Sequence, residues 1–213
     1  MNIGIDIDGV ILDTENWFRS MSHIYDEYIN GGGVVDASAV KIQKRMAWTT
    51  DDFSSFVNDC MYYGMEHAPL MPCCKYVIDK LKSMGHRLVV ITARGINEEK
   101  EIELAKATLE KYGLTFDKIY YNNPNKLPAC IEEKIDYMID DSSDNVRYLS
   151  DAGVKCLYFR DFGSMPVDSD NVTEVANWGE IYRFFKDMKW ICMTTWSKGI
   201  PSSCFFIWVL KII

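Results

Sequence analysis

The sequence predicts an α/β fold in which helices cover both faces of a parallel β-sheet. Short apolar runs alternate with segments of helical periodicity along most of the chain. The run at 88–91 is continuous and rich in β-branched residues, as strands buried on both faces of a sheet are. Polar residues follow the carboxyl ends of several runs. We therefore expect a three-layer, Rossmann-like parallel sheet with right-handed crossovers and a ligand site beyond the carboxyl ends of its strands.

The individual elements follow from local sequence signals. Thr49 or Thr50 caps one helix, Asn97 caps another, and Gly85 is placed like the glycine that follows a helix end. We expect strands at 3–7, 88–91, 119–121, 137–139 and 154–159, and helices at 15–29, 37–47, 51–63, 73–84, 98–111 and 143–151.

Residues 13–68 interrupt the alternation of strands and helices, because they are mostly helical. They follow the first strand directly, and Pro69 and Pro72 mark the return to the main body. The sequence therefore predicts a core domain made of 1–12 and 69–189, with a small helical cap at 13–68 inserted after the first strand.

The segment 190–213 is far more apolar than the residues before it. Its uninterrupted apolar part, 204–210, is much shorter than the roughly 20 residues that a membrane span needs, so we expect no transmembrane span. A peripheral anchor, a packing arm and an aberrant extension past a disrupted stop remain open as explanations of this tail.

Composition limits the partners and the cellular location. The net charge is −8 and no long basic run is present, which excludes polymeric nucleic acid as an expected partner. A small phosphorylated substrate remains compatible, because a metal ion outweighs the net charge locally. The seven cysteines lack a regular spacing, and no signal peptide is visible, so we expect free thiols and a cytoplasmic location. The oligomeric state stays open, with a homodimer as one arrangement.

Acidic and hydroxyl side chains follow the expected strands. Asp6 and Asp8 follow the first, Thr92 and Arg94 the second, and Asp140 with Asp141 a later one. Residues two apart in extended chain share a face, so Asp6 and Asp8 point to one side. Carboxylates brought together in this way repel one another unless a cation lies among them, and Mg²⁺ is the usual cation at phosphate sites.

This set of residues suits phosphoryl transfer. One carboxylate can attack phosphorus, and a second, two residues on, can protonate the leaving oxygen and later accept a proton from water. A lysine and a hydroxyl can hold the phosphoryl oxygens, and a metal ion can spread the remaining charge. No histidine is required.

Four stretches of the chain resemble the four motifs of haloacid dehalogenase-like hydrolases, in the correct order. They are IGIDIDGVILDTE, VVITAR, the region of Lys126, and YMIDDSSDN, and they cover the core from residue 2 to about 160. The resemblance implies that Asp6 is the nucleophile and Asp8 the general acid/base. It also implies that Thr92, Ala93 and Lys126 bind phosphate.

The same resemblance implies a Mg²⁺ site formed by Asp6, Asp8 and Asp140, to which Asp8 contributes its backbone carbonyl. Asp141, Asp144 and Arg94 are supporting candidates. Lys118 and Lys134 are the alternatives to Lys126 as the third-motif lysine. Lys118 precedes the third strand, and Lys134 lies close to the start of the next one.

Within the superfamily, the strings DIDGV, ITAR and IDDS are similar to the cytosolic 5′(3′)-deoxyribonucleotidase type and its bacterial relatives. This similarity implies a phosphomonoesterase for nucleoside monophosphates. The alternatives are a phosphatase for a sugar phosphate or another small metabolite, a phosphotransferase, and a catalytically silent binding protein. If the cap chooses the substrate, its candidate residues are Trp17, Arg19, Arg45 and Trp48.

Overall fold

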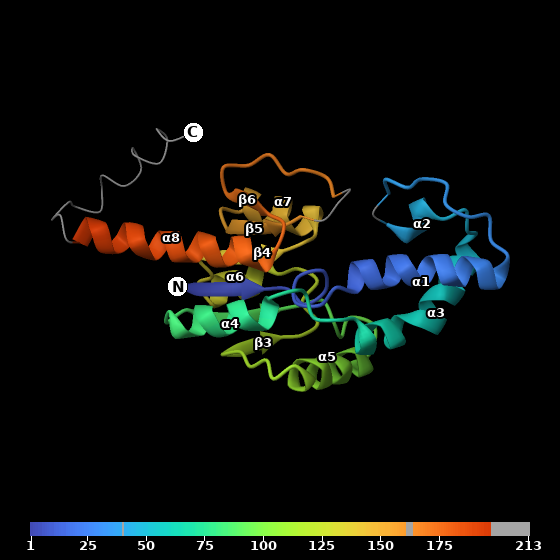
Figure 1. Cartoon of the computed structure of the whole chain (residues 1–213), viewed down its shortest axis with the longest axis horizontal. Helices are drawn as coiled ribbons and strands as arrows, with labels where there is room; N and C mark the ends of the chain where they lie inside the picture. The colour runs from blue at the N-terminus through green and yellow to red at the C-terminus, as the bar shows by residue number, and fades with distance from the viewer. Residues whose placement is uncertain (40, 161–163, 197–213) are drawn as a thin grey trace.

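The computed structural model describes residues 1–39, 41–160 and 164–196. Within these residues a parallel sheet has the strand order β3-β2-β1-β4-β5-β6 (Figure 1). This arrangement confirms the predicted fold class. The strands are β1 (Asn2–Ile5), β2 (Arg87–Ile91), β3 (Lys118–Tyr120), β4 (Tyr137–Asp140), β5 (Lys155–Phe159) and β6 (Val172–Val175).

The strand β1 lies at the centre of the sheet. Its Ile3 is in register with Leu88 of β2 on one side and with Tyr137 of β4 on the other. Consequently β1, β2 and β4 end side by side at the same edge of the sheet. The backbone N–H of Asp6 extends this pairing by donating to the carbonyl of Ile139 over 3.0 Å.

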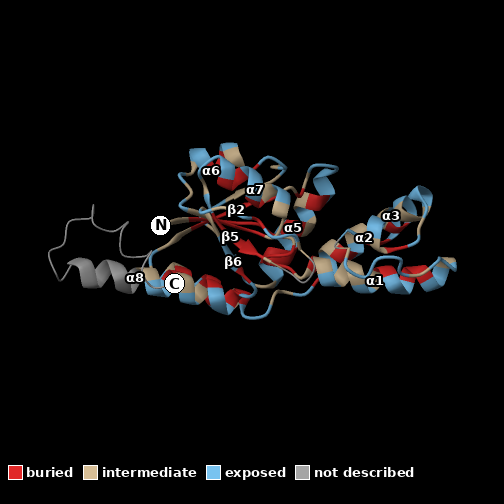
Figure 2. Cartoon of the chain, turned by 90° about the horizontal axis from the view of Figure 1, so that it is seen from above, coloured by how far each residue is buried: buried red, intermediate tan, exposed pale blue. Residues whose placement is uncertain are grey.

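Two apolar layers cover the sheet. Successive strand residues point to opposite faces, so Leu88 and Val90 join one cluster, whereas Val89 and Ile91 join the other. The helices α4 (Cys74–Ser83), α5 (Glu99–Lys111) and α8 (Trp178–Trp196) contribute to the first cluster, and α6 (Leu127–Glu132) and α7 (Ser143–Asp151) contribute to the second. Figure 2 shows the buried residues gathered between these layers.

The cap consists of α1 (Thr14–Ile29), α2 (Ile42–Arg45) and α3 (Thr50–His67), and it extends to one side of the core (Figure 1). It has an apolar cluster of its own, built around Tyr25, Phe56 and Cys60. The chain leaves and re-enters the core at one place, because Asp13 N–H donates to the Pro69 carbonyl over 2.8 Å. The cap helices therefore form an insertion at the carboxyl edge of the sheet with an apolar cluster of its own, and α3 also contacts α5 of the core.

The helix predicted at 37–47 is wrong, since the described residues of this stretch form a single helical turn, α2. The backbone of this segment pairs across a loop instead, with Val35 N–H donating to the Arg45 carbonyl and Ala47 N–H to the Gly33 carbonyl. These groups are therefore not available to a longer helix.

Two helix starts sharpen the predictions. Thr49 is the cap of α3, in a capping box with Asp52. Asn97 is not the cap of α5, because Glu98 occupies that position and the Asn97 amide donates to Glu101 over 2.7 Å.

The chain after residue 160 was not predicted in detail. It supplies the edge strand β6 and the helix α8, which packs on α4. Residues 190–196 of the predicted tail belong to α8, and the rest of the tail lies outside the described residues. Among the helices that the structure describes, none is both long enough and apolar enough to cross a membrane.

Candidate active site

The turn after β1 brings Asp6 and Asp8 to the carboxyl edge of the sheet. Gly9 has a positive φ of 70°, and its N–H donates to the Thr14 hydroxyl over 3.0 Å. A Cβ atom on Gly9 would lie only 1.9 Å from a carboxylate oxygen of Asp141. A glycine is therefore required for this turn to approach the loop that follows β4.

The loop after β4 fixes Asp140. The Asp140 carboxylate accepts the backbone N–H of Ser142 over 2.9 Å and lies 3.3 Å from the Asn145 amide nitrogen. Ser142 caps α7, so the start of that helix and the carboxylate hold each other in place. Asp140 is completely buried.

Lys126 joins these two strand ends. It lies at the start of α6, is almost completely buried, and its Nζ is 2.8 Å from Asp6 and 2.6 Å from Asp140. Burial alone would lower the pKa of Lys126, but the carboxylates of Asp140 and Asp6 outweigh it and raise that pKa. Burial raises the pKa of Asp6 to about 6, although Lys126 opposes the rise. Lys126 therefore stays protonated, whereas burial disfavours the ionised form of Asp6 beside it.

The other two lysines lie elsewhere. Lys118 pairs with Glu132 and Glu133. The carbonyl of Lys134 accepts from Asn2, the first residue of β1, and therefore lies at the amino edge of the sheet. Of the three candidates, Lys126 is the one that the structure brings to Asp6 and Asp140.

Arg94 holds Asp8 in a two-pronged ion pair. Its Nε and Nη2 donate to the two carboxylate oxygens over 2.9 and 2.7 Å. Burial would raise the pKa of Asp8, but the Arg94 guanidinium outweighs it and lowers that pKa. A third nitrogen of Arg94 donates to the carbonyl of Met65, in the last turns of α3. Arg94 therefore binds Asp8, the residue to which the resemblance assigns the role of general acid/base.

Three carboxylates gather where a cation is expected. Asp6, Asp140 and Asp141 each offer an oxygen, and these oxygens lie within 4.8 Å of one another. Burial, followed by repulsion from Asp140 and Asp6, raises the pKa of Asp141. Oxygen donors that repel one another fit a hard divalent ion such as Mg²⁺. The third carboxylate comes from Asp141, a supporting candidate in the sequence. The carboxylate of Asp8 is bound by Arg94, and the backbone carbonyl of Asp8 remains its predicted contribution.

The remaining predicted residues lie around this centre. Thr92 is buried just after β2, and its hydroxyl accepts the Arg94 N–H over 3.3 Å. Ala93 is half-buried beside it, and its carbonyl accepts from Ile96. Asp144 is exposed in the first turn of α7 and lies 3.7 Å from Arg147.

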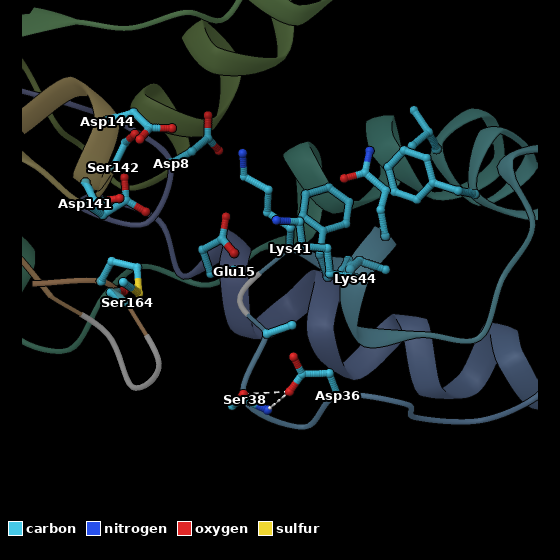
Figure 3. Close-up of a pocket in the computed structure, with 18 of the residues that line it drawn as sticks. Asp8, Glu15, Asp36, Ser38, Lys41, Lys44, Asp141, Ser142, Asp144 and Ser164 are labelled. Carbon is cyan, nitrogen blue, oxygen red and sulfur yellow. Dashed lines mark hydrogen bonds between the residues drawn. The ribbon is translucent and has the colours of Figure 1, made fainter. Parts of the chain in front are cut away.

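A cavity of about 730 Å³ separates this centre from the cap (Figure 3). Asp6, Asp8, Asp141 and Asp144 line its core side. Its cap side is lined by aromatic and aliphatic side chains, by two lysines and by two acids, namely Phe18, Ile42, Phe53, Phe56, Val57, Met61, Lys41, Lys44, Glu15 and Asp36. This size is within the range of small-molecule sites.

The cap residues predicted from the sequence do not line this cavity. Trp48 donates to Asp26 over 2.6 Å and packs on Phe56 in the cap's own core. Arg45 donates to the Ala37 carbonyl over 2.6 Å and so closes its loop. Trp17 packs edge-on against a neighbouring phenylalanine in α1, and Arg19 donates to Asn16.

Sequence reasoning missed Phe53, Lys41 and Lys44. Phe53 follows the capping box by one residue, and the lysines are three apart in a segment expected to be an ordinary amphipathic helix. The spacing of the two lysines was visible in the sequence. Which side of the turn faces the core, however, depends on how the loop folds back.

The fold and the site together define a class: a capped parallel α/β sheet whose central strand ends in two aspartates, beside a buried lysine and an acidic pair. No family model matches the chain. A curated nucleotidase from Clostridium acetobutylicum is 27% identical over 184 residues, covering 85% of this chain and 92% of the relative.

Solved structures are similar in fold. A haloacid dehalogenase-like hydrolase from Streptococcus pneumoniae has a TM-score of 0.60 at 18% identity, covering 86% of this chain and 97% of that one. A predicted phosphoglycolate phosphatase from Haemophilus somnus has a TM-score of 0.57 at 17% identity, covering 86% and 96%. These structures confirm the fold that the resemblance to haloacid dehalogenase-like hydrolases implied, and together with the curated nucleotidase they support a phosphatase.

Proposed function

We propose that this protein is a Mg²⁺-dependent phosphomonoester hydrolase that acts through an aspartyl-phosphate at Asp6. The carrying observation is the placement of Lys126 between Asp6 and Asp140, with Asp141 completing an acidic triad. A buried cation beside a nucleophile, next to a second cation site, suits a transferring phosphoryl group. Mg²⁺, when bound to the triad, would neutralise charge on the phosphoryl oxygens.

Asp6 would attack phosphorus and displace the alkoxide oxygen of the ester, which leaves with a proton from Asp8. Water would then attack the aspartyl-phosphate, and Asp8 would accept its proton, which releases inorganic phosphate and restores Asp6. The ion pair with Arg94 suits the second step, because it favours the carboxylate form of Asp8. For the first step, Asp8 must leave Arg94 and carry a proton.

We propose a nucleoside monophosphate as the substrate. The curated relative is named a nucleotidase, and the cap side of the cavity presents Phe18 and Phe53, whose rings suit a flat base.

We also propose a cytoplasmic location. The described cysteines, Cys60, Cys73, Cys74, Cys130 and Cys156, are free thiols, which supports it.

A sugar-phosphate or other small-metabolite phosphatase is the second candidate, favoured by the neighbour described as a predicted phosphoglycolate phosphatase. A panel of phosphorylated metabolites, assayed for phosphate release with and without Mg²⁺, separates the two. Turnover of nucleotides above sugar phosphates supports the first candidate. Tenfold preference for a sugar phosphate supports the second, and binding without turnover would indicate a silent protein.

A further inference from the structure

We infer that the substrate carries a second anionic group, apart from the phosphoryl group that is transferred, and that Lys41 and Lys44 of the cap bind it. This inference rests on the proposed phosphatase function and narrows its substrate class. Among nucleoside monophosphates it selects those whose base or sugar carries a further anionic group.

The two lysines lie together on the cap side of the cavity. Lys41 is the N-cap residue of α2 and Lys44 lies within its single turn, so a spacing of three residues places both on one side of that turn. Both line the cavity, and Figure 3 shows them on the side opposite Asp8, Asp141 and Asp144. The loop that carries them is closed by the bond from Arg45 to the Ala37 carbonyl.

Neither lysine has an ion-pair or hydrogen-bond partner for its side chain among the described residues. The nearby acid on the same loop, Asp36, accepts the backbone N–H and hydroxyl of Ser38 over 2.9 and 2.6 Å. The cations of the core side are already used, since Lys126 binds Asp6 and Arg94 binds Asp8. Glu15 and Asp36 also line the cavity, but neither is hydrogen-bonded or ion-paired to Lys41 or Lys44. The two lysine side chains are therefore left for a ligand, in a protein whose net charge is −8.

The transferred phosphoryl group does not need these lysines. Lys126 already stands beside Asp6, and it comes from the core rather than from the cap. Apolar side chains such as Phe53 and Met61 line the same cavity as the lysines. A ligand that satisfies all of these groups has a phosphate at one end, an apolar or flat middle, and an anion at the other end.

A matched pair of substrates isolates the second charge. We would measure kcat and KM for 4-carboxyphenyl phosphate and for its neutral analogue, 4-carbamoylphenyl phosphate, with the wild type and the double variant Lys41→Gln/Lys44→Gln. The control is Lys106→Gln/Lys111→Gln, which removes the same charge from exposed positions on α5. It accounts for general electrostatic attraction of anions.

The double variant should raise KM for the carboxylate at least tenfold, with KM for the amide changed less than twofold and kcat retained for both. Equal losses for the two esters, or no loss for either, would overturn the inference. If the double variant loses no affinity for either ester but Asp6→Asn is inactive, the anion site is refuted and the proposed phosphatase function still stands. If neither ester is turned over, the Kd values of 4-carboxybenzylphosphonate and its carbamoyl analogue decide the matter: the same tenfold selectivity supports the anion site, and its absence refutes it.

Discussion

The two sides of the cavity differ in how their charges are held. On the core side, Lys126 and Arg94 are buried and each is bound to carboxylates within 3 Å. On the cap side, Lys41 and Lys44 are exposed on a single helical turn, and no described residue pairs with them. Under the proposed function the difference has a simple meaning: the groups proposed to take part in bond making are fixed by strand ends, whereas those proposed to recognise the rest of the substrate are left adaptable.

The largest effect should come from the core side. Asp6→Asn should lower kcat by more than about a hundredfold, because an amide cannot form the aspartyl-phosphate, and loss of a nucleophile typically costs several orders of magnitude. Steady-state kinetics with the best substrate of the panel measures this. Circular dichroism should show an unchanged fold, and retention of more than a hundredth of wild-type kcat would contradict the assignment.

Metal removal should come next. EDTA should abolish turnover and Mg²⁺ should restore it, since Asp6, Asp140 and Asp141 offer only oxygen ligands. Ca²⁺ should inhibit, because its looser coordination misplaces the phosphoryl group. Asp141→Asn should weaken Mg²⁺ binding in a calorimetric titration, with Asp144→Asn, exposed on α7, as the matched control. Full activity in chelator would rule the metal out.

Two aromatic substitutions compare the cap's cavity side with its interior. Phe53→Ala should raise KM for a nucleotide by at least about fivefold and leave KM for phosphoglycolate nearly unchanged, because stacking on a base is worth ~1–3 kcal/mol. Trp48→Phe, inside the cap, should lower thermal stability and leave this preference intact. Kinetics with both substrates and thermal melts of both variants provide the measurement. Equal KM losses for the two substrates in Phe53→Ala would mean that the ring contacts no base.

The smallest effect concerns pH and stability. In the folded, metal-free protein the pKa of Asp6 is raised from its usual value to about 6, so the folded state binds more protons than the unfolded chain up to that pH. Stability should therefore fall as pH rises towards and through 6, with Tm a few degrees lower at pH 8 than at pH 5.5. Mg²⁺ should remove most of this slope, because it replaces the protons. The same slope in Asp6→Asn would show that other groups cause it.

Sequence alone was enough for the core side of the site. Asp6, Thr92 and Asp140 each follow a buried strand directly, and parallel strands end at one edge, so local sequence placed them together. Lys126 follows β3 at a distance but precedes a recognisable short helix. That Arg94 would bind the Asp8 carboxylate was not visible, because this ion pair joins residues 86 positions apart in the sequence.

The cap side could not be predicted in the same way. Trp48 was selected as an aromatic near a helix end, but its indole N–H is bound to Asp26 across the cap. Which aromatic faces the ligand is decided by packing between α1 and α3, which contact each other through residues far apart in sequence. A one-turn helix held by a loop also leaves no periodic signal, and this is why Lys41 and Lys44 were missed.

The pairing at the base of the cap bears on how such a protein can change over evolution. Besides the bond between Asp13 and Pro69, Met71 N–H donates to the Ile11 carbonyl over 2.9 Å, so the two connecting segments run side by side. The length of the segment inserted between them has little effect on the free energy of folding, because loop-closure entropy grows only with the logarithm of loop length. The cap is therefore replaceable as a block: another sequence grafted between these two points would keep the strand ends that carry Asp6 and Asp140, provided that it also supplied the carbonyl that Met65 offers to Arg94.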